Sequence, residues 1–130
     1  MRLTRWIKPY IEGKPNELYQ FKDLSGLYFI KEYQTIKYIG KSSSKLYRTF
    51  TNHFPTEKRK KENQIRHFYC RNNPAIRAKF LLCSNEKVND MEIYFINKFD
   101  PSDNFKDKIY FALKNPYLRK VIKEQLNGIL

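Results

Sequence analysis

The 130-residue sequence predicts an α+β fold, in which a small, mostly antiparallel three-stranded sheet is flanked by helices in the order β-β-α-β-α-α. Short apolar, β-rich runs alternate with segments in which apolar residues recur at helical spacing. No internal repeat and no low-complexity linker interrupts this pattern. The length suits one domain. Within it we distinguish an N-terminal basic arm over 1–24, a core over 25–105 and a C-terminal helical extension over 106–130.

The segment before the first strand, 1–24, is expected to form an irregular arm. Pro9, Gly13 and Pro15 interrupt it, and a short turn of structure is expected near 18–21. Its start is basic, but it contains no apolar run long enough for a signal peptide.

The first two strands are predicted as a β-hairpin over about 25–40. Two β-rich runs, Leu-Tyr-Phe-Ile and Ile-Lys-Tyr-Ile, flank a short polar segment over 31–35. Two such runs with a polar break are typical of a hairpin. The prediction places Tyr28 and Tyr38 on neighbouring strands.

A helix is predicted over about 44–54, directly after the hairpin. Three serines precede it and offer N-cap hydroxyl groups, and a proline ends it. Leu46, Phe50 and Phe54 recur at a spacing of four residues, which would place them on one helical face.

The remaining elements are one strand and two helices. Alternating apolar and basic residues over 76–82 predict a strand with one buried and one basic face. A helix is predicted over 88–99, ending before Pro101. Asn115 and Pro116 are typical of an N-cap and first helical residue, so a last helix is expected beyond them.

The charge of the chain indicates a polyanionic partner. The formal net charge is +13, with 26 Lys and Arg against 13 Asp and Glu. Such a chain is expected to bind nucleic acid, because Lys and Arg side chains that neutralise phosphates release the counterions condensed on them. A membrane surface is the competing partner, but it would require a basic amphipathic helix or an apolar anchor. The sequence shows neither in convincing form, so we expect no membrane partner.

The two cysteines and two histidines indicate a reducing environment rather than a disulfide or zinc scaffold. Cys70 and Cys83 cannot build a disulfide framework, and no stretch approaches the length of a membrane span, so we expect a cytoplasmic protein. A zinc site could be assembled from these cysteines with His53 and His67. Only the His67-x-x-Cys70 spacing suits one, and no second close pair accompanies it.

Five sequence elements together resemble the GIY-YIG nuclease superfamily. The resemblance covers residues 25–105, and its elements are Gly26-Leu27-Tyr28, Tyr38-Ile39-Gly40-Lys41, the helix with Arg48 and His53, Glu92, and Pro101-Ser102-Asp103-Asn104. A single Gly-x-Tyr would carry no weight, but five elements in this order are specific. The resemblance implies a GIY-YIG-like fold and a metal-dependent DNA endonuclease that hydrolyses phosphodiester bonds.

Glu92 is the expected metal ligand. It lies on an otherwise apolar helix face between Val88 and Ile96, where a carboxylate needs a partner. Mg²⁺ commonly takes one or two carboxylates together with water and substrate phosphate, so one Glu is compatible with it. The resemblance implies a single Mg²⁺ or Mn²⁺ ion held by Glu92. The alternative is a structural ion pair, for instance with Lys98.

Arg48 and His53 are expected on the helix that faces the hairpin. Arg48 follows Gly40 by eight residues, where family members carry an essential Arg that would stabilise the charge of the transition state. Family members often place a His or Tyr four residues after that Arg. This chain has Asn52 at that position and His53 one residue later. Arg48 could instead be a surface contact to the DNA backbone.

The remaining catalytic candidates are Tyr28, Tyr38, Lys41 and Asn104. A phenol has a pKa of about 10 and is a poor base unless a cation lowers that value. We therefore expect Tyr28 to orient or deprotonate water, with Lys41 or His53 assisting and Tyr38 completing the network. Asn104 is implied to brace the site. Both tyrosines could also be ordinary packing residues of the sheet, and Asn104 a simple turn residue.

DNA, double-stranded or branched, is the expected partner, lying across the face that presents Tyr28, Arg48 and Glu92. Backbone contacts are expected from Lys58, Arg59, Lys60, Lys61, Arg66, Arg77 and Lys79, with the Arg2/Arg5/Lys8 arm as a further candidate. A homodimer is one arrangement that would allow cleavage of both strands. Two alternatives stay open: a non-catalytic nucleic-acid-binding protein (an RNA-binding module or an inactivated relative), and a basic structural or ribosome-associated protein.

Overall fold

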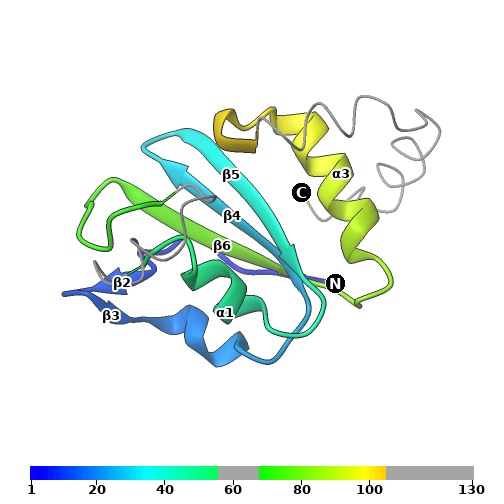
Figure 1. Ribbon diagram of the computed structural model, residues 1–130, viewed down its shortest axis with the longest axis horizontal. Helices are drawn as coiled ribbons and strands as arrows, with labels where there is room; N and C mark the ends of the chain where they lie inside the picture. Colours follow the sequence, from blue (N-terminus) through cyan, green and yellow to red (C-terminus); the bar gives the residue numbers. More distant parts are fainter. Residues whose placement is uncertain (56–67, 105–130) are drawn as a thin grey trace.

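The computed structural model describes residues 1–55 and 68–104 and shows an α+β fold built on an antiparallel four-stranded sheet. The strands run in the spatial order β1 (Arg2–Leu3), β6 (Ile76–Leu82), β4 (Gly26–Glu32) and β5 (Thr35–Ser42) (Figure 1). The predicted hairpin and the third strand are confirmed. The expectation of three strands is wrong by one, because β1 from the N-terminal segment pairs with β6.

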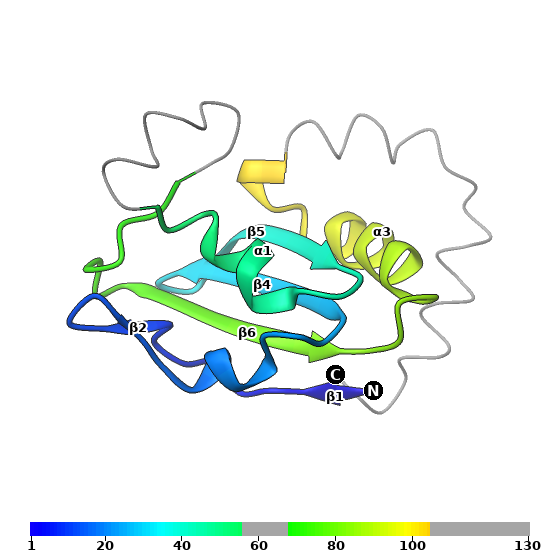
Figure 2. The same ribbon diagram turned by 60° about the horizontal axis from the view of Figure 1, so that its bottom comes forward.

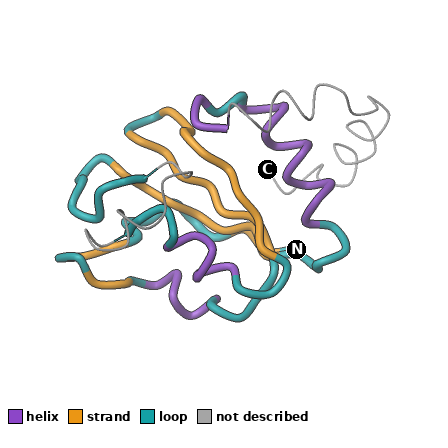
Figure 3. Tube along the Cα trace, in the orientation of Figure 1, coloured by secondary structure: helices purple, strands orange, loops and turns teal. Residues whose placement is uncertain are grey.

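Within residues 1–55 and 68–104, one α-helix packs on each face of the sheet. The α1 helix (Leu46–Thr51) lies over one face, and α3 (Val88–Phe99) packs against the other, beside β5 (Figures 2 and 3). The bounds predicted for α3 are confirmed. The helix predicted over 44–54 is shorter at both ends: it begins at Leu46, and beyond Thr51 its end tightens into a 3₁₀ turn. A short 3₁₀ turn, η2 (Ser102–Asn104), follows α3. The helix predicted beyond 115 and the extension over 106–130 lie outside the described residues.

The β4 strand lies at the centre of the core because both of its faces are covered. Its first five residues are all buried, which explains why the run shows no alternation of apolar and polar residues. Tyr28 and Ile30 pack toward α1 with Phe50 and Phe80. The opposite face packs toward α3, through a cluster that contains Leu27, Phe29, Ile39, Leu81, Met91 and Phe95.

A β-bulge in the hairpin divides β5 between the two faces of the sheet. Ile30 lies opposite Tyr38, but the next residue, Lys31, lies opposite Ile36, so the register shifts between them. Residues two apart on a regular strand face the same side. Because of the bulge, Ile36 packs with the α3-side cluster while Tyr38 packs with the α1-side cluster.

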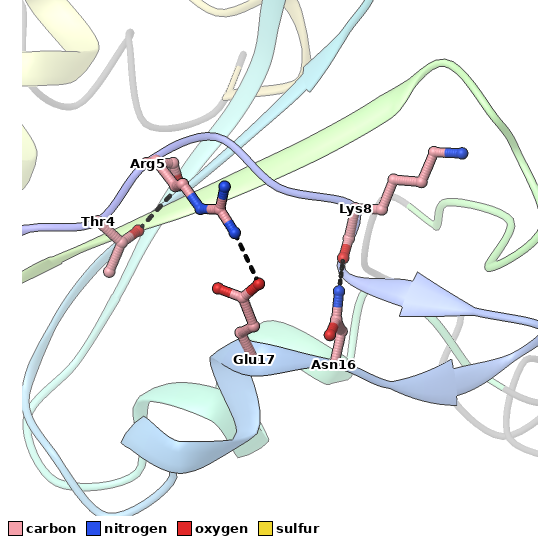
Figure 4. A network of polar contacts seen from close by, with 5 residues as sticks. All are labelled: Thr4, Arg5, Lys8, Asn16 and Glu17. Atoms are coloured by element: carbon pink, nitrogen blue, oxygen red, sulfur yellow. Dashed lines mark hydrogen bonds and ion pairs between the residues drawn. The ribbon is translucent and has the colours of Figure 1, made fainter.

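The N-terminal segment is part of the fold rather than an irregular arm. After β1 it forms a small hairpin of β2 (Tyr10–Ile11) and β3 (Lys14–Pro15), followed by the 3₁₀ turn η1 (Glu17–Phe21), which confirms the expected turn near 18–21. Polar contacts hold this segment to itself: Arg5 pairs with Glu17 at 2.8 Å, and the Asn16 side chain donates to the Lys8 carbonyl at 3.0 Å (Figure 4). Its apolar residues supply part of the core, namely Ile7, Tyr10, Leu18 and Phe21.

Gly26 is required where β4 passes β6. A Cβ atom at position 26 would overlap the backbone carbonyl oxygen of Leu81 and press on the Leu46 side chain. A backbone atom in a paired strand cannot move aside without disturbing the pairing.

We expect Gly26→Ala to lower the free energy of unfolding by about 1–3 kcal/mol, measured by urea denaturation. Thr35→Ala, at an exposed position of β5, is the control and should change it by less than about 0.5 kcal/mol. Equal stability of the two variants would contradict this account of Gly26.

Candidate active site

The Tyr28 side chain lies over a glycine on the neighbouring strand. Gly40 is the direct partner of Tyr28 in the β4–β5 ladder. A Cβ atom at position 40 would overlap the ring and hydroxyl of Tyr28. The glycine therefore leaves the space in which the phenol is held, and this steric relation ties the two motifs of the hairpin together.

Tyr28, Tyr38 and His53 form a buried aromatic and polar cluster on the α1 side of the sheet. The Tyr28 hydroxyl and His53 Nε2 form a hydrogen bond of 2.8 Å. The Tyr38 ring lies 4.5 Å from the His53 ring and 6.0 Å from the Tyr28 ring, with which it is stacked. His53 is only 2% exposed. An unprotonated Nε2 accepts the phenol proton, so this pair can move a proton between two side chains in a site shielded from bulk water.

The tightened end of α1 places His53. The backbone amides of His53 and Phe54 donate to the carbonyl groups three residues earlier, which is 3₁₀ rather than α-helical geometry. A 3₁₀ turn advances the chain by about 120° per residue instead of about 100°. This extra rotation carries His53 toward the sheet, although it stands five residues after Arg48. Arg48 is exposed on α1, whose packing contacts include β5.

On the other face of β5, Lys41 contacts two oxygen-bearing side chains of α3. Its ammonium group donates a hydrogen bond to Asn89 Oδ1 and lies 3.6 Å from Glu92 Oε1. Asn89 and Glu92 are three residues apart, which puts them on the same side of the helix. Glu92 is buried, at 8% exposure, whereas Asn89 is exposed. Asn89 was missed from the sequence, because only the tertiary structure brings it to Lys41.

The chemistry of these side chains suits a hard divalent cation. One carboxylate and one amide oxygen face a single cationic atom, and Mg²⁺ or Mn²⁺ uses the same kinds of oxygen donor, completed by water and phosphate. No group of three His, Cys, Asp or Glu side chains suited to a metal occurs among residues 1–55 and 68–104. Glu92 would therefore be the protein's principal ligand, with Asn89 the nearest second oxygen.

Asn104 closes the outer edge of β5. The backbone amide of Ile39 donates to Asn104 Oδ1, and Asn104 Nδ2 donates to the carbonyl of Ile39, both at 2.8 Å. A side-chain amide thus replaces a neighbouring strand at one edge position of the sheet. Both groups are buried, so the bonds fix the strand segment between Tyr38 and Lys41.

Tyr69 extends the cluster and was not found from the sequence. Its ring lies 6.4 Å from that of His53, and its amide donates to the His53 carbonyl at 2.7 Å. Its hydroxyl donates to Asp103 Oδ2 at 2.5 Å. Burial raises the pKa of Tyr69 above its ordinary value, and the hydrogen bond to the Asp103 carboxylate raises it further. Tyr69 therefore stays a proton donor and holds the η2 turn against the cluster.

The structure places the predicted site residues around β5 rather than on one face of the sheet. Tyr28 packs on the α1 side, and Glu92 belongs to α3 on the opposite side. Tyr28 and Glu92 therefore approach β5 from opposite sides of the sheet, and Arg48 is exposed on α1. β5 joins the two halves, because it presents Tyr38 to one side and Lys41 to the other.

The predicted DNA-backbone residues fall into three groups. Arg77 and Lys79 lie on β6, on the α3 side of the sheet, alternating with buried residues of the α1-side cluster. In the proposed arm, Arg5 is paired with Glu17 and the Arg2 guanidinium lies 5.4 Å from the Phe21 ring centroid. The segment that holds Lys58, Arg59, Lys60, Lys61 and Arg66 lies outside the described residues.

The cysteines are both free, and burial raises the pKa of the Cys83 thiol. His53, the one described histidine of the conceivable zinc set, is hydrogen-bonded to Tyr28.

In the part of the chain that the structure describes, no helix has the length and apolar character needed to cross a membrane.

Tyr69 predicts a loss of stability at high pH. Its folded pKa lies above the ordinary value of 10.0, so between these two values only the unfolded chain releases the proton. The stabilisation is complete below about pH 10 and declines as the pH rises beyond it. We expect Tyr69→Phe to reduce this decline by about 1.4 kcal/mol per pH unit, measured by urea denaturation between about pH 9 and 12. Identical pH slopes for the two proteins would contradict the assignment.

Comparisons with known proteins add no assignment to this geometry. No family model, no curated protein and no solved structure matches the chain.

Proposed function

We propose that the chain is a metal-dependent DNA endonuclease of GIY-YIG type. One observation supports it most strongly: the two motifs of the hairpin pair so that Tyr28 lies over Gly40, with its hydroxyl bonded to His53. A strand tyrosine that only packed the sheet would need neither the glycine beneath it nor a buried histidine at its hydroxyl. Lys41, which contacts Glu92, and Ile39, which is bonded to Asn104, both belong to β5 of this hairpin. Their contacts support the same proposal.

The proposed chemistry is hydrolysis of a phosphodiester bond beside β5. Tyr28 takes a proton from the attacking water as its own proton passes to His53 Nε2. The water oxygen bonds to phosphorus, and the bond between phosphorus and the leaving sugar oxygen breaks. Lys41 and Arg48 supply positive charge for the phosphate oxygens in the transition state. Tyr38 orients the His53 ring by packing against it, and Asn104 fixes β5 through its hydrogen bonds to the Ile39 backbone.

A divalent ion would be held by Glu92, with Asn89 beside it. When bound, such an ion supplies further stabilisation of the negative charge that develops on the phosphate and leaving oxygen. The ammonium group of Lys41 would then turn from Glu92 toward the phosphate.

One observation favours a second candidate, a non-catalytic nucleic-acid-binding protein. Lys41 already lies 3.6 Å from Glu92 Oε1, so the buried carboxylate has a cationic partner from the chain itself. In an inactivated relative this ion pair would be structural. Such a protein would bind nucleic acid through the +13 charge of the chain without metal-dependent cleavage.

Glu92→Ala separates the two candidates. We expect wild-type protein with Mg²⁺ or Mn²⁺ to nick or linearise supercoiled plasmid. The variant should be at least about 100-fold slower, because the metal ligand is lost. Glu86→Ala, which removes an exposed acid before α3, is the matched control and should keep full activity. EDTA should abolish cleavage by wild type. No cleavage by wild type, with equal salt-sensitive binding by all three proteins, would favour the binding protein.

Tyr28→Phe tests the proton-transfer step. The substitution keeps the ring over Gly40 and removes only the hydroxyl bonded to His53. We expect plasmid cleavage to slow by about 10²–10⁴-fold, the range typical of a lost general base. Tyr94→Phe, at another buried tyrosine, controls for the loss of a phenol and should leave the rate unchanged. Cleavage at the wild-type rate by folded Tyr28→Phe would exclude this role.

A further inference from the structure

A second cluster of chemistry-bearing residues lies on the α3 side of the sheet, around the only tryptophan of the chain. We call it the Trp6 patch and define it as Trp6, Lys31, Tyr33, Arg77 and Lys79. The Lys31 and Lys79 ammonium groups lie 4.4 and 4.7 Å from the centroid of the Trp6 ring. Arg77 is the strand partner of Lys31, and it precedes Lys79 by two residues, so all three cations share one face.

The patch is strongly cationic and partly withdrawn from water. Among the described residues, none of its three cations takes part in an ion pair. Glu32, the neighbouring acid, instead accepts a hydrogen bond from the Asn73 side chain at 2.9 Å. Partial burial and the nearby charge of Lys31 lower the pKa of Lys79. The Trp6 ring attracts both ammonium groups, but the two groups repel each other, and a bound anion would relieve that repulsion.

The patch is also hollowed and carries an exposed aromatic side chain. Trp6, Lys31, Tyr33 and Arg77 line a shallow hollow of about 460 Å³. Tyr33 is 75% exposed. Two of the Arg77 hydrogen bonds run to the carbonyl groups of Pro74 and Ile76, at 2.7 and 2.8 Å, which hold the guanidinium at this rim.

Tyr33 occupies a backbone position that does not suit a tyrosine. It is the first of two residues between β4 and β5, and its φ is +53°. Hairpin turns of this length favour glycine where φ is positive, and a bulky residue there is strained. Its amide is held by the Ala75 carbonyl at 3.0 Å. Strain at an exposed aromatic residue points to a use for the side chain outside the fold.

We infer that the Trp6 patch binds a single strand of nucleic acid, with unpaired bases on its aromatic side chains and backbone phosphates at Lys31, Lys79 and Arg77. Single-strand binding commonly combines a basic track with aromatic platforms, because stacking accepts any base once it is unpaired. A duplex offers the same phosphates but keeps its bases stacked inside. The site lies on the face opposite Tyr28 and does not depend on phosphodiester hydrolysis.

The single tryptophan allows a direct test. Full-length Glu92→Ala protein in EDTA is titrated with a thymidine oligonucleotide of about twelve nucleotides, with a blunt duplex of equal length, and with pyrophosphate. We expect the single strand to quench Trp6 fluorescence and to bind at least about tenfold more tightly than the duplex. Pyrophosphate should bind more weakly than the single strand. Unchanged Trp6 fluorescence, or equal quenching and affinity for the duplex, would overturn the inference.

Charge variants locate the phosphates. Lys31→Ala and Lys79→Ala should each weaken single-strand binding about tenfold and reduce the slope of log K against log salt by about 0.7. Lys14→Ala removes an equal charge from the exposed β3 strand and should change neither value appreciably. The same loss in all three variants would show that only net charge matters, and the inference would be wrong.

Tyr33→Gly gives a readout that a purely structural residue would not produce. Relief of the positive φ should raise the thermal midpoint by about 2–5 °C, while single-strand affinity falls about tenfold. A more stable variant with unchanged affinity would remove Tyr33 from the site.

Parallel plasmid assays keep the two proposals distinct. Cleavage by wild type without a Trp6 signal would overturn this inference alone, whereas a single-strand Trp6 signal without cleavage would support it and count against the nuclease.

Discussion

The contact between the Tyr28 ring and Gly40 is the constraint on which the rest of the candidate site depends. It exists only if β4 and β5 pair in the observed register, because a shift of one residue would move Tyr28 to the other face of the sheet. Once the ring lies there, its hydroxyl meets His53, and the His53 ring contacts Tyr38. The geometry of the whole cluster therefore follows from one close approach between two strands.

β5 is the edge strand of the described sheet, and residues of the candidate site cover part of its outer edge. An unprotected edge presents unpaired amides and carbonyls to other chains. Here Asn104 makes hydrogen bonds to both the amide and the carbonyl of Ile39. Ile39 lies between Tyr38, which faces the α1 side, and Lys41, which faces α3. Tyr69 ties the same 3₁₀ turn to the His53 cluster through Asp103. Edge protection and site assembly are thus served by the same few residues.

The cations of the described chain are arranged in more than one way. Arg5 is paired with an acid of its own segment, and Lys41 contacts Glu92, so neither adds simply to a general positive surface. Lys31 and Lys79 instead converge on one aromatic ring. Net charge alone indicates an affinity for polyanions. The two arrangements differ in their partners, because Lys41 faces a carboxylate and an amide whereas Lys31 and Lys79 face an aromatic ring.

The sequence by itself determined the α+β class, the hairpin, the strand at 76–82 and the bounds of α3, because these follow from local periodicity and breaker residues. It also singled out Tyr28, Tyr38, His53, Glu92 and Asn104 as candidates. Only the tertiary structure decided which of them meet. The fourth strand, the roles of Asn89 and Tyr69, and the division of β5 by its bulge all rest on contacts between distant segments. Such contacts depend on side-chain directions and backbone register, which local patterns do not encode.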